Sequence, residues 1–297
     1  MNKLSLTELD TIFISYDEPN ADKNYSELLQ IIPWAKRIHG VKGSDAAHKA
    51  AANLSETDRF ISIDADNIID PKFFAQEIEI TDQNKDFVFS WCGRNAVNGL
   101  VYGNGGVKCW TKDFVLNMKT HENSAPGDIK NEVEFCFDPR YFQMNDCFST
   151  SYINGSPKQA FRAGFREGVK MCLAEGTKVQ KIRFRESLYW KNYHRLLIWM
   201  NVGADVKNGL WAIYGARLGC QMTNLTDWDY LNVRDFEYLN ELWNFDISLK
   251  YNDNNIMEAI ESIGKELLFQ LDLPVSIFDA DQSRFFKTVY SNPIRIG

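Results

Sequence analysis

Short apolar runs alternate with helix-like segments over roughly the first 110 residues of this chain. Residues 11–15 and 59–63 are rich in β-branched and aromatic side chains, which is typical of buried strands. Residues 22–32 carry apolar side chains at helical spacing, and residues 45–52 are rich in alanine, which favours a helix. This alternation predicts an α/β unit with a mostly parallel sheet.

The pattern changes in the second half of the chain. Ser156 and Pro157 form a helix start signal, and apolar side chains at helical spacing follow them. From about residue 187 onward the pattern is largely helical and aromatic. We therefore expect an α/β domain over residues 1–180 and a mainly helical region over residues 181–297 packed on it.

The composition is that of a folded protein, because 44% of the 297 residues are apolar and 13% are aromatic. Six scattered cysteines without a C-x-x-C pair favour buried thiols in a reducing cytoplasm over disulfides or a structural zinc site. The first residues lack the pattern of a signal peptide, and no apolar stretch has the length of a membrane span. We expect a cytoplasmic protein with no membrane partner.

Charge is distributed unevenly along the chain. The formal net charge of −7 argues by itself against a nucleic-acid partner. From Lys158 to Arg195, however, ten basic residues stand against three acidic ones, whereas from Asp227 to Glu258 eight acidic residues stand against two basic ones. One face of the protein can therefore be strongly positive although the whole is acidic.

Two carboxylates, Asp64 and Asp66, follow the second strand-like run. Residues two apart point the same way along an extended chain, so both can converge on one hard cation where the strand ends. A divalent ion held by only two carboxylates keeps positions open for water or substrate phosphates. In a sugar-transferring enzyme, the nucleotide diphosphate leaving group would lie there. We expect a metal site at this pair; the alternative is a polar strand end with a turn.

The D-x-D spacing also occurs in other settings. Phosphatases of the dehalogenase type use it, but usually on the first strand and followed by Thr or Val, whereas Asn67 and Ile68 follow it here on a later strand. A second copy, Asp279-Ala280-Asp281, lies near the C-terminal end, and we interpret it as a chance repeat.

Two loops next to the predicted metal site are candidates for donor binding. Asp17 and Glu18 follow the first strand, where a carboxylate could accept hydrogen bonds from a uracil or a ribose, or form an ordinary turn. His39, Lys42 and Gly43 precede the alanine-rich helix, a favourable setting for phosphates, although the spacing is not that of a P-loop or a dinucleotide site.

Residues 103–106 read Gly-Asn-Gly-Gly. Without side chains at Gly105 and Gly106, the backbone could approach a sugar or a pyrophosphate closely, and a tight hairpin is the alternative. His48, on the alanine-rich helix, is either a packed core histidine or a ligand.

A general base would be needed to deprotonate an acceptor hydroxyl. Four acidic residues that flank aromatic side chains are candidates, and among them we assign the catalytic role to the last two: Glu132, Glu134, Asp138 and Asp146.

Basic residues recur every fourth position after the helix start, at Lys158, Arg162, Arg166 and Lys170. This spacing places one cation on each turn of one helix face. Such a face could follow a phosphate backbone, an arginine on it could bind the donor pyrophosphate, or the face could simply be solvated.

The first strand with Asp17, the strand ending in Asp64 and Asp66, and the glycines at 103–106 resemble nucleotide-sugar glycosyltransferases of the GT-A type. Over about the first 200 residues the chain also resembles glycosyltransferases encoded by tailed bacteriophages. The segments that carry this second resemblance are Tyr16–Asn20, Ala35–Gly43 with Ala46–His48, Asn98–Gly103 and Ile153–Glu167.

The resemblance implies a GT-A fold, Rossmann-like with a mostly parallel sheet, and a UDP-sugar as donor. It also implies Mn²⁺ or Mg²⁺ between the diphosphate and the pair Asp64 and Asp66, with Asp17 facing the uridine. Lys158, Arg162 and Arg166 would lie toward the acceptor or the pyrophosphate. Some members of the group resemble enzymes that glycosylate hydroxymethylated pyrimidines in DNA, which implies a modified duplex as partner and a flipped-out base.

Two other functions remain open from the sequence. The chain could be a glycosyltransferase that acts on a surface glycan or a protein, or a non-catalytic module that binds nucleotide or metal. Salt-sensitive DNA binding would separate the first of these from a DNA-modifying enzyme.

Overall fold

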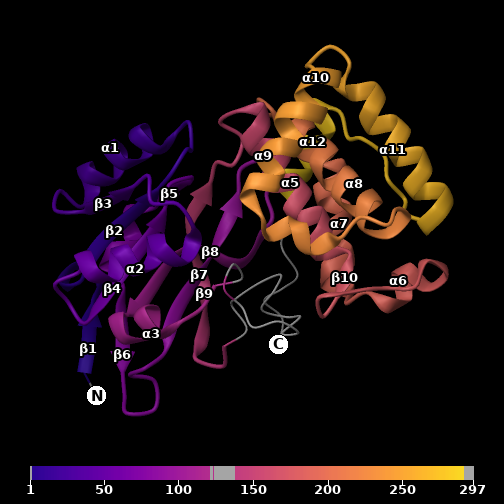
Figure 1. The fold of residues 1–297 in the computed structure, drawn as a ribbon. Helices are drawn as coiled ribbons and strands as arrows, with labels where there is room; N and C mark the ends of the chain where they lie inside the picture. Colours follow the sequence, from indigo (N-terminus) through magenta and orange to yellow (C-terminus); the bar gives the residue numbers. More distant parts are fainter. Residues whose placement is uncertain (1, 121–122, 124–137, 291–297) are drawn as a thin grey trace.

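The computed structural model describes residues 2–120, 123 and 138–290, and it is divided into a sheet-containing half and a helical half (Figure 1). The N-terminal residues form the sheet, and the C-terminal residues form the helices beside it. This arrangement confirms the expected α/β class with a helical C-terminal region.

A seven-stranded sheet forms the centre of the N-terminal half, and its strands follow one another in the order β3, β2, β4, β8, β7, β9 and β5. In that order their bounds are Lys36–His39, Asp10–Ser15, Arg59–Asp64, Val101–Thr111, Val88–Asn95, Tyr141–Ser151 and Asn67–Ile69. Strand β2 pairs in parallel with β3 and β4, and β7 pairs in parallel with β9. Strand β8 is antiparallel to both β4 and β7, and β5 is antiparallel to β9. Because β8 reverses direction between β4 and β7, the carboxyl ends of β2, β3, β4, β7 and β9 share one edge.

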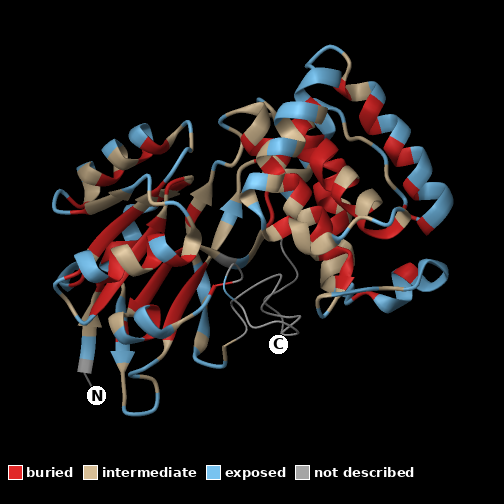
Figure 2. Cartoon of the chain, viewed as in Figure 1, coloured by how far each residue is buried: buried red, intermediate tan, exposed pale blue. Residues whose placement is uncertain are grey.

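Helices cover both faces of this sheet, as the alternation of side chains along each strand requires. Phe13 faces the cluster that contains Leu28 of α1 (Ala21–Ile31), whereas Ile12 faces the cluster with Ala51 of α2 (Ser44–Leu54) and Phe114 of α3 (Lys112–Asn117). Buried residues accordingly fill the strands in Figure 2, and exposed residues lie on the outer sides of these helices.

Shorter elements complete the sheet-containing half. Strands β1 (Asn2–Ser5) and β6 (Glu77–Ile80) form an antiparallel pair. A short 3-10 helix, η2, spans Pro71–Ala75, and another, η1, spans Leu6–Glu8.

The helical half is built around two helices in close contact, α5 (Pro157–Met171) and α8 (Gly209–Leu225). A Cβ atom at Gly164 would lie 2.0 Å from the carbonyl oxygen of Ala212, and one at Gly215 would lie 2.2 Å from that of Phe161. Only glycine permits this approach of the two backbones. Ser156 caps α5 by accepting a hydrogen bond from the Gln159 amide, as the helix start signal predicts.

The remaining helices surround this pair. They are α6 (Phe184–Ser187), α7 (Trp190–Asn201), α9 (Phe236–Leu242), α10 (Ser248–Lys250), α11 (Ile256–Leu271) and α12 (Ala280–Val289), with the short turns η4 (Lys181–Arg183) and η5 (Tyr230–Arg234) and the π-helical turn η6 (Trp243–Ile247). A two-stranded hairpin, β10 (Leu173–Ala174) and β11 (Thr177–Lys178), follows α5.

The hydrophobic clusters assign α5 to the helical half, because Phe161, Phe165 and Val169 pack with Trp211 and Ile260 in one core. The proposed domain boundary at residue 180 stays a prediction. In the structure α5, the first helix of the C-terminal core, lies before that residue. Asp279 caps α12 and Asp281 pairs with Arg284, so the second D-x-D copy has a structural role. No helix among the described residues is long and apolar enough to cross a membrane.

Candidate functional site

Asp64 and Asp66 lie at the shared carboxyl edge of the sheet. Asp64 is the last residue of β4, next to Ile14 of β2, and Asp66 precedes β5. The chain between them is fixed from two sides. The Asn24 side chain donates a hydrogen bond of 2.8 Å to the Ala65 carbonyl, and the Tyr152 amide donates one of 2.7 Å to the Asp66 carbonyl.

The Asp66 carboxylate is held by two donors. Ser151 Oγ donates to Oδ2 at 3.0 Å, and Asn67 Nδ2 donates to Oδ1 at 2.6 Å. Asn67 and Ser151 stand opposite each other in the pairing of β5 with β9, so one register position supplies both donors. Burial, the charge of Asp64 and the charge of Glu18 raise the pKa of Asp66 to about 7, against the lowering effect of Ser151. The charges of Asp64 and Glu18 therefore act on Asp66 at this edge.

The glycines of β8 lie directly against this pair. A Cβ atom at Gly106 would lie 2.1 Å from Asn67 Nδ2 and 2.9 Å from the Asp64 Cβ, and one at Gly105 would lie 2.3 Å from the Gly93 amide nitrogen. The structure thus brings together the glycine segment and the D-x-D pair. It places the glycines in the second strand of the β7–β8 hairpin.

Asp17 and Glu18 form the loop after β2 at the same edge. The Tyr16 amide donates a hydrogen bond of 2.8 Å to Glu18 Oε2, and Arg162 Nη2 lies 3.5 Å from Asp17 Oδ1. A cavity of about 30 Å³ separates this loop from the start of α5. Its lining residues are Asp17, Glu18, Pro19, Ser156, Lys158, Gln159 and Arg162.

The loop after β3 contacts the helical half. Lys42 Nζ lies 2.8 Å from Glu237 Oε1 of α9, and this hydrogen bond raises the pKa of Lys42. His39 Nδ1 lies 3.0 Å from Ser15 Oγ at the carboxyl end of β2. Gly43 has a φ of 93°, a conformation that favours glycine, and it begins α2. The three residues line the same edge as Asp64, and Lys42 connects that edge to α9.

Three of the four cations of α5, Arg162, Arg166 and Lys170, contact other side chains of the protein. The Arg162 and Arg166 guanidinium groups lie 5.3 and 4.8 Å from the centre of the Phe236 ring. Lys170 Nζ lies 2.6 Å from Glu167 Oε1, and both side chains are half-buried. Arg162 and Lys158 are the two that reach the cavity beside Asp17.

The proposed general bases lie apart from this cluster. Asp138 precedes the amino end of β9, so it lies at the edge of the sheet opposite Asp64, where Arg140 lowers its pKa. Asp146 is exposed in the middle of β9, where the pairing with β7 changes register. Glu132 and Glu134 lie outside the described residues. A catalytic role for Asp138 or Asp146 stays a prediction.

Sequence reasoning missed a buried lysine beneath the site. Lys108 is 5% exposed, pairs in register with Ser62, and donates a hydrogen bond of 3.2 Å to the Gly105 carbonyl. In the sequence, the feature that could have revealed this buried residue is a single lysine within the otherwise apolar run from Val107 to Trp110. His48 is also buried, and burial lowers its pKa while the Asp64 carboxylate opposes that shift.

The residues at the site fit a hard divalent cation. Among the described residues, no group of three or more His, Cys, Asp and Glu side chains is arranged around a common point, so protein carboxylates alone would give a two-ligand site. Asn67 Oδ1 is buried without a hydrogen-bond partner, and it supplies a neutral oxygen next to Asp66. Oxygen donors of this kind suit Mg²⁺ or Mn²⁺ with open positions for substrate.

Comparison with known proteins identifies no family. No family model matches the chain, and no curated protein matches it. Among solved structures, the chain is similar to the glycosyltransferase GlyE of Streptococcus pneumoniae TIGR4, with 16% identity and a TM-score of 0.30. The match covers 82% of this chain and 64% of that one, so this chain spans less than two thirds of its length. A likeness of this size supports neither a fold nor an activity, and the function is inferred from the site.

Proposed function

We propose that this protein is a glycosyltransferase that moves a sugar from a UDP-sugar to an acceptor hydroxyl with the help of Mn²⁺ or Mg²⁺. One observation carries the proposal. Asp64 and Asp66 lie at the carboxyl edge of the sheet, with Gly106 of β8 packed against Asn67 and Asp64. Ligands of open α/β sheets bind at this edge.

The carboxylates and the glycines have complementary tasks. Asp64 and Asp66 would hold the divalent ion, which neutralises the charge that develops on the departing diphosphate. An ion there also removes the mutual repulsion that raises the pKa of Asp66. Gly105 and Gly106 allow β8 to pack closely against β7 and Asn67, and this packing would position the D-x-D pair.

The loop after β2 would bind the nucleoside. Asp17 Oδ1 lies 3.5 Å from Arg162 Nη2, a long ion-pair contact that a ribose or uracil donor can replace. Once displaced from Asp17, Arg162 would turn to the pyrophosphate or to the acceptor, with Arg166 behind it. A guanidinium group can bind two phosphate oxygens at once.

We further propose a hydroxymethylated pyrimidine of DNA as the acceptor. The sequence resemblance to phage-encoded enzymes and the ten basic residues between Lys158 and Arg195 support this choice. A base inside a duplex would have to be flipped out so that its hydroxymethyl oxygen reaches the sugar carbon.

A mass-spectrometric transfer assay tests both the glycosyltransferase activity and the DNA acceptor. The protein is incubated with Mn²⁺ and a panel of UDP-sugars, in the presence of hydroxymethylcytosine DNA or unmodified DNA of the same sequence. A gain of one sugar on the hydroxymethylated DNA alone is the expected result. Donor hydrolysis without DNA labelling would overturn the acceptor and point to a glycan or protein. No donor turnover at all would overturn the glycosyltransferase.

A further inference from the structure

The chain between α5 and α7 carries an exposed group of cations that is separate from the carboxylate site. We call residues 178–191 the basic segment; it includes β11, η4 and α6. It holds five basic residues and one acidic residue. Lys181, Arg183 and Arg185 are exposed, and no carboxylate among the described residues forms an ion pair with any of them.

This segment differs from α5, the other basic part of the chain. On α5, Arg162 contacts Asp17 and Phe236, and Lys170 pairs with Glu167. The positive charge of α5 is thus largely compensated inside the protein. In a protein of net charge −7, the basic segment concentrates exposed positive charge within a short stretch of chain.

Exposed aromatic rings adjoin these cations. Tyr189 and Trp190 are 53% and 54% exposed, with ring centres 6.1 Å apart. Lys191 Nζ lies 6.0 Å from the centre of the Tyr189 ring and 5.6 Å from that of Trp190. Aromatic faces beside cations stack on nucleobases while the cations contact phosphates.

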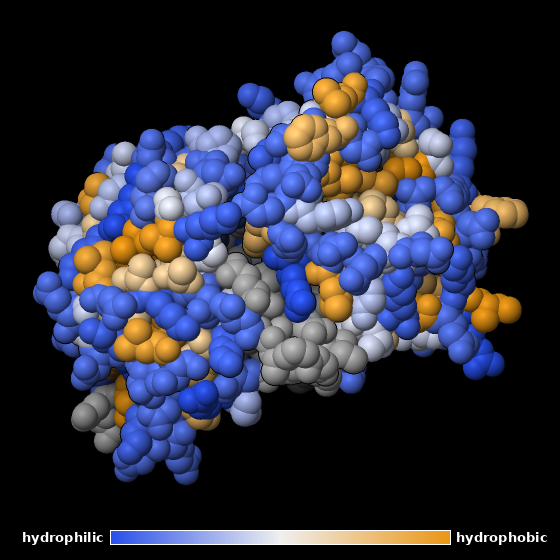
Figure 3. Space-filling model, in the orientation of Figure 1, coloured by the Kyte–Doolittle hydropathy of each residue, from blue (hydrophilic) through white to orange (hydrophobic). Residues whose placement is uncertain are grey.

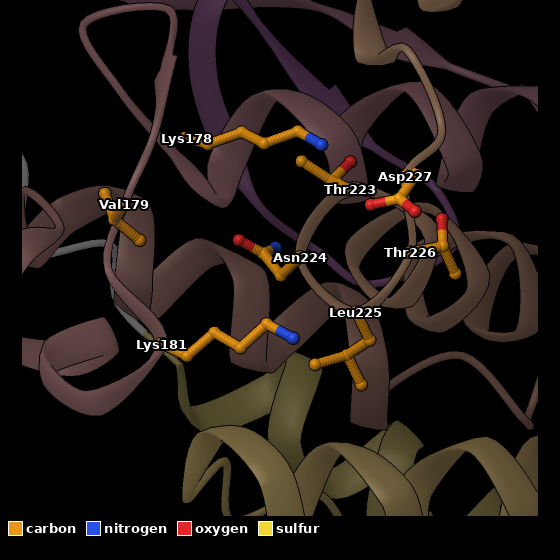
Figure 4. A pocket seen from close by; sticks show the side chains of 8 residues that line it. All are labelled: Lys178, Val179, Lys181, Thr223, Asn224, Leu225, Thr226 and Asp227. Carbon is orange, nitrogen blue, oxygen red and sulfur yellow. The ribbon is translucent and has the colours of Figure 1, made fainter.

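A pocket of about 260 Å³ opens beside the segment (Figure 4). Lys178 and Lys181 extend into it from one side, opposite Thr223 and Asp227 at the end of α8. Lys178 also donates a hydrogen bond of 3.2 Å to the Trp228 carbonyl. The pocket therefore offers cationic donors together with acceptors, which suits a phosphate with its attached sugar.

From these contacts we propose that the basic segment, with Tyr189 and Trp190, is a nucleic-acid-binding surface. Charge complementarity and the exposed rings identify a phosphate-linked chain of bases as the occupant. A bilayer is a poorer fit, because the apolar Phe184 and Leu188 point inward and only Ile182, among the residues between Lys181 and Ser187, is apolar and exposed. The inference rests on the proposed function for its DNA acceptor, but binding at this surface requires no donor.

Fluorescence anisotropy with labelled, unmodified 20-nucleotide single strands and duplexes, without donor or metal, tests the surface. The triple variant K181E/R183E/R185E should bind at least about tenfold more weakly, and its salt dependence should be shallower than that of the wild type. The matched control K3E/K72E/K85E makes the same change in charge with exposed lysines of the sheet half, and it should keep most of the affinity.

The aromatic part of the surface is tested by Trp190→Ala, which should weaken single-strand binding about tenfold. Equal losses in both triple variants, or wild-type binding that does not change with salt, would overturn the inference. So would binding to anionic vesicles in place of oligonucleotides. Donor hydrolysis, measured in parallel, separates the two proposals. Turnover without DNA binding overturns the surface and the DNA acceptor but not the glycosyltransferase. DNA binding without turnover overturns only the glycosyltransferase.

Discussion

Ser151 Oγ donates a hydrogen bond of 3.0 Å to Asp66 Oδ2, although the two residues are 85 positions apart. The bond joins the end of β9 to the D-x-D pair, and Asn67 supplies the second donor from the opposite strand. These donors orient the Asp66 carboxylate while Asp64 and Glu18 repel its charge. The ionised Asp66 carboxylate therefore costs stability, and the proposed cation would offset that cost.

That cost gives a pH dependence. The pKa of Asp66 is raised to about 7, so the folded protein binds more protons than the unfolded chain between about pH 4 and pH 7. Stability of the metal-free protein should therefore fall as the pH rises through this range. Asp66→Asn removes the penalty and should be more stable than the wild type by about 1–2 kcal/mol at pH 8, with little difference at pH 4.

Thermal unfolding of both proteins in a chelator, from pH 4 to pH 8, measures this difference. Asp82→Asn is the control, because Asp82 is fully exposed near Lys85. A gain for Asp66→Asn that does not grow with pH would contradict the raised pKa.

Gly106 is expected to tolerate no side chain. In Gly106→Ala the new Cβ would meet Asn67 Nδ2 at 2.1 Å and displace the donor to Asp66, at a cost of about 1–3 kcal/mol of stability. Donor turnover should fall more than tenfold. Gly40→Ala is the control, since Gly40 has a φ of 73° but no atom within 4 Å of the added Cβ. It should lose about 1 kcal/mol and keep donor turnover.

Arg162→Ala and Arg166→Ala should impair sugar transfer to the acceptor more than donor hydrolysis, by about tenfold in the ratio of the two rates. Both guanidinium groups lie over Phe236 beside the cavity next to Asp17. Arg284→Ala, which removes an exposed guanidinium on α12, should change neither rate. Parallel assays of hydrolysis and transfer measure the ratio, and equal losses in both would count against an acceptor role.

Arg217 is expected to be a structural residue of the helical half. It is 2% exposed and donates to the Met200 and Ile260 carbonyls at 2.9 Å each, and burial lowers its pKa to about 10. Arg217→Ala leaves these buried acceptors unpaired and should cost about 2–4 kcal/mol of unfolding free energy. Denaturant unfolding measures it. A cost below 1 kcal/mol, similar to that of the exposed Arg284→Ala, would show that water replaces the side chain.

Local patterns were sufficient to predict the elements around the site. The apolar run before Asp64 marks a strand end, and Ser156 with Pro157 marks the start of α5, because both signals depend on neighbouring residues. Parallel pairing then places Asp17 and Asp64 at one edge of the sheet.

Long-range contacts were beyond the reach of these patterns. The spacing of Arg162 and Lys170 indicates a charged helix face, but whether its charges meet solvent depends on Asp17 and Phe236, which other elements supply. Ser151 likewise acquires its role only from the pairing of β5 with β9. The face in Figure 3 is mostly hydrophilic, with several separate groups of apolar residues, so hydropathy does not mark the site.

The central claim is that Asp64 and Asp66 form the donor site, and the binding of UDP with Mn²⁺ tests it most directly. Isothermal titration should show metal-dependent binding to the wild type and at least a tenfold loss in Asp64→Asn. The variant Asp281→Asn, in the second D-x-D copy, is the matched control, and it should bind as the wild type does because Asp281 only pairs with Arg284 at the surface. Equal affinity of Asp64→Asn and the wild type, or no binding of UDP to the wild type, would contradict the account.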